Sequence, residues 1–422
     1  MTFIADLHIH SHYSLATSKE LTPSNLNYWA KLKGITVLGT GDCIHPGWLD
    51  ELKDKLVPAQ NGLYCLKEKY NQKHSLSDKK MYFILTTEIS CIYKKNGSVR
   101  KVHNLCVFPD FDAVERLQRR LSKIGNIHSD GRPILGLDSK NLLEMVLETS
   151  DNSQNDTHKS FLIPAHIWTP WFSALGSRSG FDSMEECFEG LTKYIFAVET
   201  GLSSDPPMNR RCSFLDPFTL ISNSDAHSLQ KLGREANLFD TEISYQGIYN
   251  ALKCCSPDSI TKNGFKGTIE FFPQEGKYYF DGHRKCDICW NPITTINNNS
   301  ICPKCGKPIT KGVMYRVTQL ADRDIEQAIK KSNDFYSITS LLDIIAEITQ
   351  KNTNSKTVQR EYLRLIETFA PELEILLNTP ISDIETAGGE SLAEGIRRLR
   401  AGEVIIKEGF DGEFGQIKVF GE

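Results

Sequence analysis

The chain has 422 residues, 40% of them hydrophobic, and a formal net charge of −4, so its composition fits two or three packed globular domains. It contains no run of eighteen apolar residues, and its first residues lack the apolar core of a signal peptide, so we expect neither a membrane span nor secretion. The twelve cysteines are therefore expected in a cytoplasmic, reducing environment, as thiols or metal ligands.

The first expected strand ends in two residues that can bind metal. It begins at Ile4, and its last residues include His8 and His10, which are two positions apart and leave the same face of the strand. Similar residue types stand at or beside later apolar runs: Asp42, Glu88, His103, His166, Glu199, Asp225 and His227. We therefore expect a multi-metal site assembled at strand ends. The alternative is that these residues are unrelated buried polar groups satisfied by hydrogen bonds.

Helix-like segments separate these strands over roughly the first 270 residues. Expected helices cover residues 26–33, 112–123, 139–147 and 183–191, and the polar stretches 67–80 and 149–160 are expected to be surface insertions. Repeated strand–helix order predicts a parallel α/β fold, most simply a barrel. Active sites of such barrels lie at the C-terminal ends of the strands, where the metal-binding residue types occur here.

The ordered motifs resemble those of the PHP (polymerase and histidinol phosphatase) family: His8-x-His10, Asp42, Glu88, His103, His166 and Asp225-x-His227. This resemblance implies a distorted seven-stranded β/α barrel with a two- or three-metal phosphoesterase site. It implies that His8, His10, Glu88 and Asp225 hold one ion and carry catalysis, that Glu88, His103 and His166 hold a second, and that Asp42 and His227 serve a third. Ala16 stands where the family has a further ligand, so the third ion would need His12, Glu199 or water.

Histidine and carboxylate ligands suit zinc, manganese or iron, and carboxylates also suit magnesium. A carboxylate such as Glu88 can bridge two ions. Two ions roughly 3.5–4 Å apart can activate a water and stabilise both the attacking and the leaving oxygens at phosphorus. The expected chemistry is therefore phosphoester hydrolysis.

Two CxxC motifs follow the barrel region, Cys286-x-x-Cys289 and Cys302-x-x-Cys305. Four thiolates at this spacing can bind one structural zinc ion tetrahedrally. We expect a zinc ribbon at residues 276–317, after a catalytic barrel at residues 1–275. Residues 277–316 contain seven Lys or Arg but two Asp. This excess of positive charge is explained either by contact with phosphates or by ordinary surface solvation.

The remaining residues, 318–422, are expected to form a mainly helical domain with a glycine-rich tail. Helical patterns cover residues 322–331, 337–350, 357–369 and 372–377, and residues 415–420 are expected to form a strand. This region has nineteen Asp or Glu against twelve Lys or Arg, so a general DNA-binding surface is not expected. Arg397, Arg398 and Arg400 are the exception, either as phosphate contacts or as a solvated helix end.

The order of barrel, ribbon and helical part resembles the endonuclease Q family, as do residues 6–14, 39–42 and 199–211. The resemblance implies a metal-dependent DNA-repair endonuclease that cuts on the 5′ side of a deaminated base, such as uracil, hypoxanthine or xanthine, or of an abasic site. The cut would leave a 3′-hydroxyl. Two alternatives stay open: a PHP-type small-molecule phosphatase of the histidinol-phosphate kind, and a nonenzymatic nucleic-acid-binding protein.

Recognition of a damaged base requires a pocket that receives the extruded base. Trp168, Trp171 and Phe172 closely follow the expected ligand His166, and they could either stack on that base or simply cover the barrel mouth. Arg210 and Arg211 are expected to bind flanking phosphates, and Trp48 is a further aromatic candidate.

Overall fold

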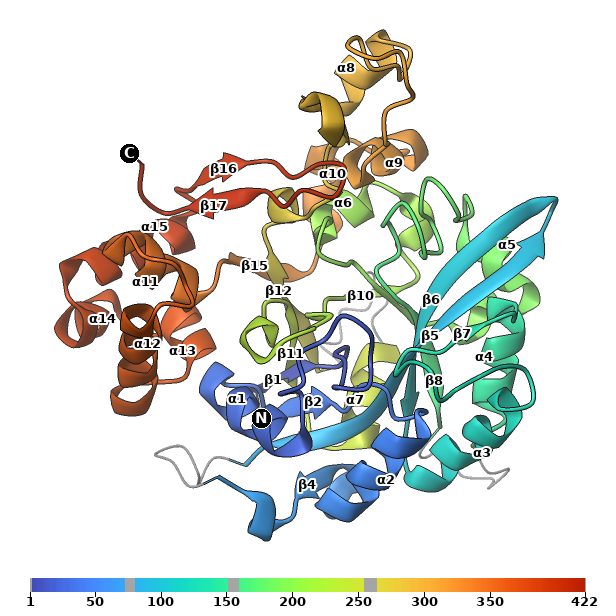
Figure 1. Cartoon of the computed structure of the whole chain (residues 1–422), viewed down its shortest axis with the longest axis horizontal. Helices are drawn as coiled ribbons and strands as arrows, with labels where there is room; N and C mark the ends of the chain where they lie inside the picture. The colour runs from blue at the N-terminus through green and yellow to red at the C-terminus, as the bar shows by residue number, and fades with distance from the viewer. Residues whose placement is uncertain (1, 73–79, 151–158, 254–263, 422) are drawn as a thin grey trace.

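The computed structural model describes residues 2–72, 80–150, 159–253 and 264–421 (Figure 1). Within these residues a mixed sheet of eleven strands forms the centre, with the order β15-β12-β11-β1-β2-β5-β4-β3. Strands β6 and β7 pair with β5 off this path, and β8 pairs with β6. The strands are β1 Thr2–Asp6, β2 Val37–Gly39, β3 Leu56–Pro58, β4 Tyr64–Leu66, β5 Tyr82–Lys95, β6 Ser98–Phe108, β7 Ile134–Leu135, β8 Phe161–Pro164, β11 Ala236–Asp240, β12 Phe265–Phe271 and β15 Asp334–Ile338. A separate parallel pair, β9 Ala197–Glu199 and β10 Thr219–Ile221, lies beside β8.

The longest strands, β5 and β6, form an antiparallel hairpin that extends beyond the body of the molecule (Figure 1). Asn96 and Gly97 join them with positive φ angles of 53° and 75°, which is the conformation of a tight two-residue hairpin turn. The two strands therefore pair without an intervening helix. This corrects the expectation of uniform strand–helix alternation, although β1, β2 and β5 do pair in parallel. The count of seven barrel strands stays a prediction.

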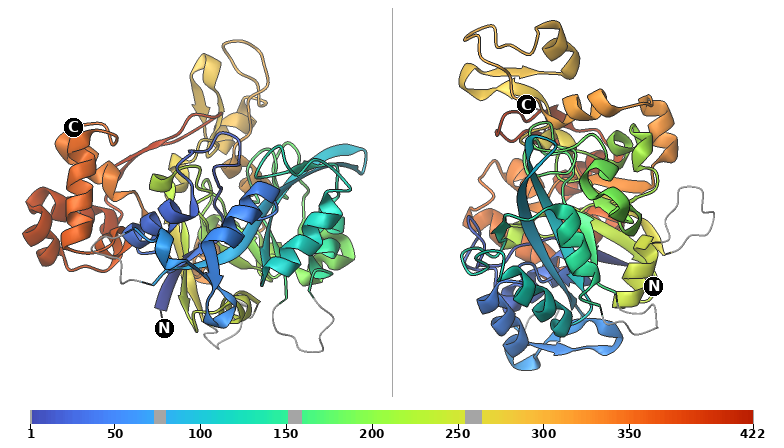
Figure 2. Two further views of the ribbon diagram at one scale, coloured as in Figure 1. Left: turned by 60° about the horizontal axis from the view of Figure 1, so that its bottom comes forward. Right: turned by 90° about the vertical axis from the view of Figure 1, so that its right-hand side faces the viewer.

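Helices cover the outside of this sheet (Figure 2). They are α1 Pro23–Lys33, α2 Pro46–Lys55, α3 Phe111–Leu121, α4 Ser139–Leu147, α5 Met184–Phe188, α6 Pro206–Arg210 and α7 Tyr245–Lys253. The expected helices at 26–33, 112–123 and 139–147 are confirmed. The one expected at 183–191 is a short α5 followed by a 3₁₀ turn. The side chains of Thr22, Asp110 and Asp138 cap the N-termini of α1, α3 and α4, as these residue types commonly do. The insertions predicted at 67–80 and 149–160 lie partly outside the described residues.

The predicted ribbon region protrudes from the body (Figure 1). It contains β13 Asp281–His283, β14 Ile288–Trp290 and α8 Pro292–Asn297, around a small cluster formed by Ile288, Cys302 and Ile309. Helix α9, Val313–Leu320, connects it to the body. The buried Arg316 of α9 donates hydrogen bonds to the carbonyl oxygens of Leu175 and Phe181 at 2.9 Å each, which fixes the base of the protrusion to the barrel.

The C-terminal part is mainly helical and lies on the opposite side from the β5–β6 hairpin (Figure 1). It contains α10 Ile325–Lys331, α11 Leu341–Thr349, α12 Lys356–Thr368, α13 Glu372–Leu377, α14 Ile381–Gly388, α15 Glu390–Ala401, β16 Ile405–Lys407 and β17 Gln416–Lys418. The helix expected to start at residue 337 starts at Leu341 instead, because residues 334–338 form β15 and join the barrel sheet through β12.

A buried ion pair also docks this part onto the barrel. Lys33 Nζ lies 2.6 Å from Glu372 Oε2, and the Tyr362 hydroxyl donates to the same carboxylate at 2.7 Å. The domain boundaries at residues 275 and 317 stay predictions. Among the described residues, no helix is long and apolar enough to cross a membrane.

The arginines near the end of α15 bind within their own domain. Arg397 and Arg398 pair with Glu394, and Arg400 donates to the carbonyl oxygens of Leu376 and Ile375. Their arrangement therefore favours the helix-end interpretation over phosphate contacts.

Candidate metal-dependent active site

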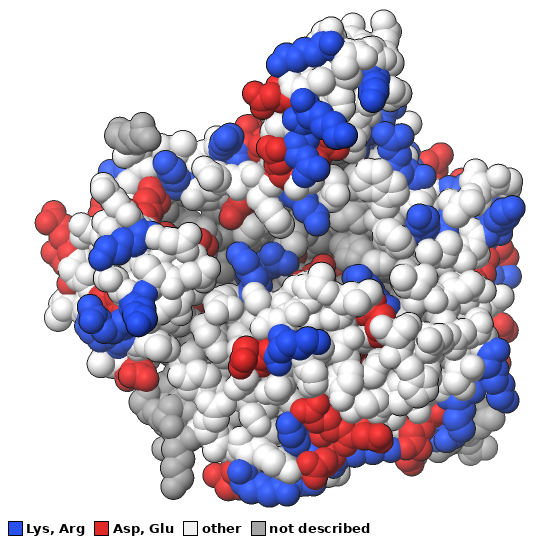
Figure 3. Space-filling model, viewed as in Figure 1, with Lys and Arg blue, Asp and Glu red and all other residues white. Residues whose placement is uncertain are grey.

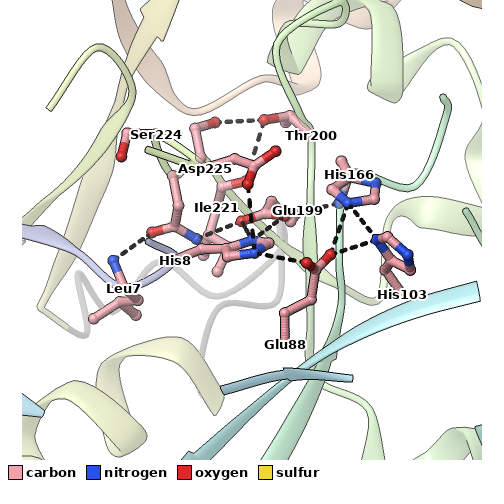
Figure 4. A network of polar contacts seen from close by, with 12 residues as sticks. Leu7, His8, Glu88, His103, His166, Glu199, Thr200, Ile221, Ser224 and Asp225 are labelled. Carbon is pink, nitrogen blue, oxygen red and sulfur yellow. Dashed lines mark hydrogen bonds and ion pairs between the residues drawn. The ribbon is translucent and has the colours of Figure 1, made fainter. Parts of the chain in front are cut away.

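The expected metal-binding residues come together at one end of the sheet, around Glu88 (Figure 4). Glu88 Oε1 lies 2.6 Å from His103 Nδ1 and 3.0 Å from His166 Nε2. Its other oxygen, Oε2, lies 3.4 Å from His10 Nε2 and 3.6 Å from His8 Nε2. Three groups have ligand atoms within 4.8 Å of one another: His8, His10 and Glu88; Glu88, His103 and His166; and His10, Asp225 and His227.

Strained backbone holds several of these residues. His166 follows β8 with φ 31°, Asp225 follows β10 with φ 46°, and Asp42 follows β2 with φ 50°. Positive φ is costly for residues other than glycine and persists where surrounding contacts over-determine it. Here the backbone N–H of Asp225 donates to the His8 carbonyl at 2.9 Å, and that of His166 donates to Glu199 Oε2 at 2.8 Å.

Glu199 lies behind His8. Its Oε2 lies 3.0 Å from His8 Nδ1, and its Oε1 accepts a hydrogen bond from Asn223 at 2.8 Å. A carboxylate on Nδ1 fixes the imidazole so that Nε2 carries the free lone pair, as in many metal sites. His8 Nε2 is buried and has no hydrogen-bond partner among the described residues. Because buried polar atoms are rarely left unpaired, this atom fits a bound metal ion.

Asp42 orients His10 in the same way, with Oδ1 3.1 Å from His10 Nδ1. Its Oδ2 accepts hydrogen bonds from the backbone N–H and hydroxyl of Ser11 and from the hydroxyl of Ser14. In this structure Asp42 therefore supports His10 and lies outside the three ligand groups, the third of which is formed by His10, Asp225 and His227. The expected role of Asp42 at a third ion stays a prediction.

The two proposed additional ligands do not enter these groups either. Glu199 supports His8 and His166 from behind. His12 lies elsewhere, with Nδ1 3.3 Å from the Leu21 carbonyl and Nε2 3.5 Å from Glu51.

The charges of the site favour ionised carboxylates. Burial raises the pKa of Glu88, but nearby His103 and Arg132 outweigh it and hold the pKa well below its usual range. Burial also opposes ionisation of Asp225. The hydrogen bond from His10 and the charge of His8 outweigh burial, so the pKa of Asp225 is lowered overall. Burial lowers the pKa of His103 to about 4. Burial also lowers the pKa values of His8, His10 and His166, but nearby carboxylates outweigh it and raise all three, that of His10 to about 9. Because metal ions bind ionised carboxylates and neutral imidazoles, these three histidines would release protons when metal binds.

Arg132 is a site residue that no sequence pattern indicated. Its Nη1 lies 3.1 Å from Glu88 Oε2, and it lines the cavity above the metal-binding groups. The preceding Gly131 packs against Asp42, because a Cβ atom there would lie 2.3 Å from Asp42 Oδ2. A glycine directly before an arginine is too common to signal this arrangement.

A cavity of about 620 Å³ opens over the site. Its wall includes Trp171, which is 38% exposed, and Phe172, whose ring centroid lies 4.8 Å from that of His103. Trp168 is only 1% exposed and donates through Nε1 to Asn209 at 2.7 Å. Trp48 is fully buried and donates to the Gly41 carbonyl at 2.8 Å. Both are core residues, which corrects the expectation that they contact a base.

Of the two predicted phosphate-binding arginines, Arg210 is structural, whereas Arg211 is partly exposed and its role at a phosphate stays a prediction. Arg210 is 2% exposed and donates to the carbonyl oxygens of Leu215 and Phe218 at 2.6 and 3.0 Å. Arg211 donates to the Thr318 hydroxyl at 3.3 Å, at the junction with α9. The basic residues that do line the cavity are Arg132, Lys231, Arg234 and Lys277. Figure 3 shows Lys and Arg atoms within the hollow between the protrusion and the helical part.

The ribbon region contains a second candidate metal group, made of His283, Cys286, Cys302 and Cys305. It includes three of the four predicted cysteines, with His283 in place of Cys289. Adjacent residues of a strand point to opposite faces. In β14 the side chain of Ile288 is buried in the small cluster, so that of Cys289 points outward and is exposed. Cys305 Sγ lies 3.4 Å from His283 Nδ1.

Comparisons with known proteins agree with this architecture. The model of the MJ0043 C-terminal domain matches residues 340–403. The chain is 32% identical to the uncharacterized protein MJ0043 of Methanocaldococcus jannaschii over 273 residues, which are 64% of this chain but only a third of that protein.

Two solved structures match nearly the whole chain. The lesion-specific endonuclease PfuEndoQ from Pyrococcus furiosus is 30% identical, with a TM-score of 0.82 and coverage of 99% of this chain and 95% of that one. Endonuclease Q in complex with a 27-mer duplex that has an abasic lesion at the active site is also 30% identical, with a TM-score of 0.83 and coverage of 99% and 96%. This chain therefore belongs to the endonuclease Q family.

Proposed function

We propose that this protein is a divalent-metal-dependent DNA-repair endonuclease. It hydrolyses the phosphodiester on the 5′ side of a deaminated base, such as uracil, hypoxanthine or xanthine, or of an abasic site, and leaves a 3′-hydroxyl. The observation that carries this proposal is the position of Glu88. One oxygen of this buried carboxylate faces His103 and His166 and the other faces His8 and His10, so a single side chain can bridge two ions.

Two or three divalent ions, Zn, Mn, Fe or Mg, fit the three ligand groups and would supply an activated water and charge stabilisation at phosphorus. The chain's own residues prepare the site for them. Glu199 and Asp42 hold His8 and His10 with Nε2 directed inward. Arg132 Nη1 pairs with Oε2 of Glu88, and the Arg132 side chain is 26% exposed. Its remaining N–H groups can therefore bind a phosphate oxygen of the scissile group.

DNA is the proposed substrate because the cavity combines basic and aromatic side chains. Lys231, Arg234 and Lys277 can bind backbone phosphates, and Trp171 can stack on an extruded base. The solved complex of a family member with lesion DNA at its active site supports the same substrate class for this chain. We further propose that His283, Cys286, Cys302 and Cys305 hold one structural zinc ion.

The test is cleavage of an end-labelled duplex that contains one deoxyuridine, deoxyinosine or abasic site, with Mn²⁺, Mg²⁺ or Zn²⁺ supplied separately. The expected product ends 5′ of the lesion in a 3′-hydroxyl, which a DNA polymerase can extend. Undamaged duplex and the Asp225→Asn variant are the controls. Hydrolysis of 4-nitrophenyl phosphate without any cleavage of lesion DNA would support a small-molecule phosphatase and overturn the proposal.

A further inference from the structure

One wall of the active-site cavity is built by a segment far away in the sequence. The C-terminal loop, residues 408–415, joins β16 to β17 and reaches from the helical part to the base of the protrusion (Figures 1 and 2). Its residue Phe414 lines the same cavity as His166 and Asp225. The phenyl ring is 59% exposed, so it gains little from packing in the folded chain.

Backbone hydrogen bonds hold this loop rigidly against residues 274–280. The N–H groups of Gly409, Gly412 and Gly415 donate to the carbonyl oxygens of Gln274, Lys277 and Glu275 at 2.7, 2.9 and 3.0 Å. The approach is close enough to require glycine at two of these positions, since a Cβ atom on Gly409 or Gly415 would lie about 2.4–2.5 Å from backbone oxygens. Phe414 is therefore presented to the cavity by a fixed loop.

The wall alternates rings with a positive charge. Trp171 contacts Tyr278 edge to face, with ring centroids 5.9 Å apart. Next to them, Lys277 Nζ lies 5.5 Å from the centroid of Tyr278 and 5.9 Å from that of Phe414. A nucleic-acid strand repeats in the same way, with a flat base and then a phosphate for each nucleotide, and proteins bind such strands with aromatic platforms beside cations.

We propose that Phe414 and Lys277 bind the nucleotide next to the lesion, with the Phe414 ring stacking on its base and the Lys277 ammonium pairing with its phosphate. This inference rests on the proposed function. It assigns a specificity role to the C-terminal loop, and it gives the helical part a contribution to substrate binding even though that part is acidic overall.

The salt dependence of DNA binding distinguishes the stacking contact of Phe414 from the ionic contact of Lys277. In the Asp225→Asn background, which is expected to bind lesion duplex without turnover, Phe414→Ala is expected to raise Kd roughly tenfold at every salt concentration. Lys277→Ala is expected to raise Kd and also to reduce the slope of log Kd against log salt by about one. Phe414→Trp keeps a flat ring and should retain binding. Ile406→Ala, on the same hairpin but outside the cavity wall, is the matched control and should bind like the parent.

Replacement of a neighbouring base by one that stacks poorly identifies the position that is contacted. A non-planar 5,6-dihydrothymine placed beside the lesion, first on its 5′ and then on its 3′ side, keeps a base at that position and should weaken binding by the parent protein at one of the two positions only. At that position Phe414→Ala should cause no further loss, because the planar stacking partner is already absent. Normal affinity of Phe414→Ala, or additive losses at both positions, would overturn the inference. The proposed function fails separately, if wild-type protein cuts no lesion DNA.

Discussion

The protein gathers candidate metal ligands in two regions, which are built in opposite ways. Around Glu88 the side chains come from several separate elements: Glu88 and His103 lie in the middle of β5 and β6, and the others follow β1, β8 and β10. They are mostly buried, and the carboxylates Glu199 and Asp42 support them. In the protruding region four side chains within residues 283–305 form the group, and the cluster beneath it has three buried residues, of which Cys302 is itself a member of the group. A large core can fix ligand positions without metal, whereas a small module depends on the ion for its fold. The two regions should therefore respond differently to the loss of a ligand.

The largest effect is expected at the barrel mouth. Asp225→Ala should reduce lesion-DNA cleavage by at least about three orders of magnitude, because it removes a carboxylate shared by His8 and His10. The melting temperature and the affinity for lesion duplex should change little, since the surrounding core remains. Cleavage kinetics, calorimetry and binding measurements on one preparation test this. Wild-type cleavage by pure variant protein would show that the site is assigned incorrectly.

In the ribbon region the loss of a ligand should instead unfold the module. Cys286→Ser and His283→Ala are each expected to release one zinc ion per chain and to make residues 281–310 sensitive to protease, because zinc binding supplies the folding free energy of such modules. Cys289→Ser is the matched control and should keep its zinc, since Cys289 faces outward. Elemental analysis measures the zinc content of each variant, and limited proteolysis measures the protease sensitivity of residues 281–310. Zinc loss in Cys289→Ser together with retention in His283→Ala would restore the four-cysteine site expected from the sequence.

A smaller effect is expected where the cavity contacts the base. Trp171→Ala should slow cleavage of lesion DNA by about one to two orders of magnitude, because base–aromatic stacking contributes roughly 1–3 kcal/mol. Hydrolysis of bis(4-nitrophenyl) phosphate, which has no base to stack, should change little. If both activities and the melting temperature fell together, Trp171 would be a structural residue.

The effect with the least consequence for cleavage concerns stability, in the interior where Glu270 is fully buried. Burial raises its pKa to about 8, against hydrogen bonds from Ser222 and Thr268 that lower it. The folded state therefore holds this proton more tightly than the unfolded state. The stability that the proton contributes is complete below about pH 4.5 and declines as the pH rises through about 8. Glu270→Gln should thus gain stability relative to wild type between pH 5 and pH 8, by an amount on the order of a few kcal/mol.

Melting temperatures of wild type and Glu270→Gln at pH 5, 6, 7 and 8 test this expectation. The exposed Glu326→Gln is the control and should follow wild type throughout. Parallel pH profiles for wild type and Glu270→Gln would contradict it.

The side chains that gather around Glu88 were predictable because apolar runs beside His or carboxylate residues are a local signal. The expected strand-end position holds for His8, His166 and Asp225, which follow β1, β8 and β10, but Glu88 and His103 lie in the middle of β5 and β6. Supporting roles were not predictable in this way. Whether Asp42 faces an ion or faces His10 depends on hydrogen bonds from residues that the tertiary fold brings to it.

The roles of the aromatic and basic residues also depend on tertiary contacts and could not be predicted from the sequence. Trp168 and Trp171 lie three positions apart on one loop, yet the path of that loop buries the first and exposes the second. Arg210 looked available in the sequence but fills a buried site, whereas Arg132 stands in no recognisable motif and contacts Glu88. The assignment of His283 over Cys289 depends on which face of β14 packs inward.

The pairing of β15 with β12 has a consequence for solubility. Strand β12 would otherwise end the central sheet with unpaired backbone N–H and C=O groups, and such an edge is a template for association between chains. Residues 334–338 cover it in parallel register, and the strands approach so closely that a Cβ atom on Gly267 would lie 1.9 Å from the Asp334 carbonyl oxygen. A fragment that stops at residue 275 would retain every ligand around Glu88 but expose this edge. It should therefore aggregate more readily than the longer chain, in which the sheet ends instead at the short strand β15, beside α15.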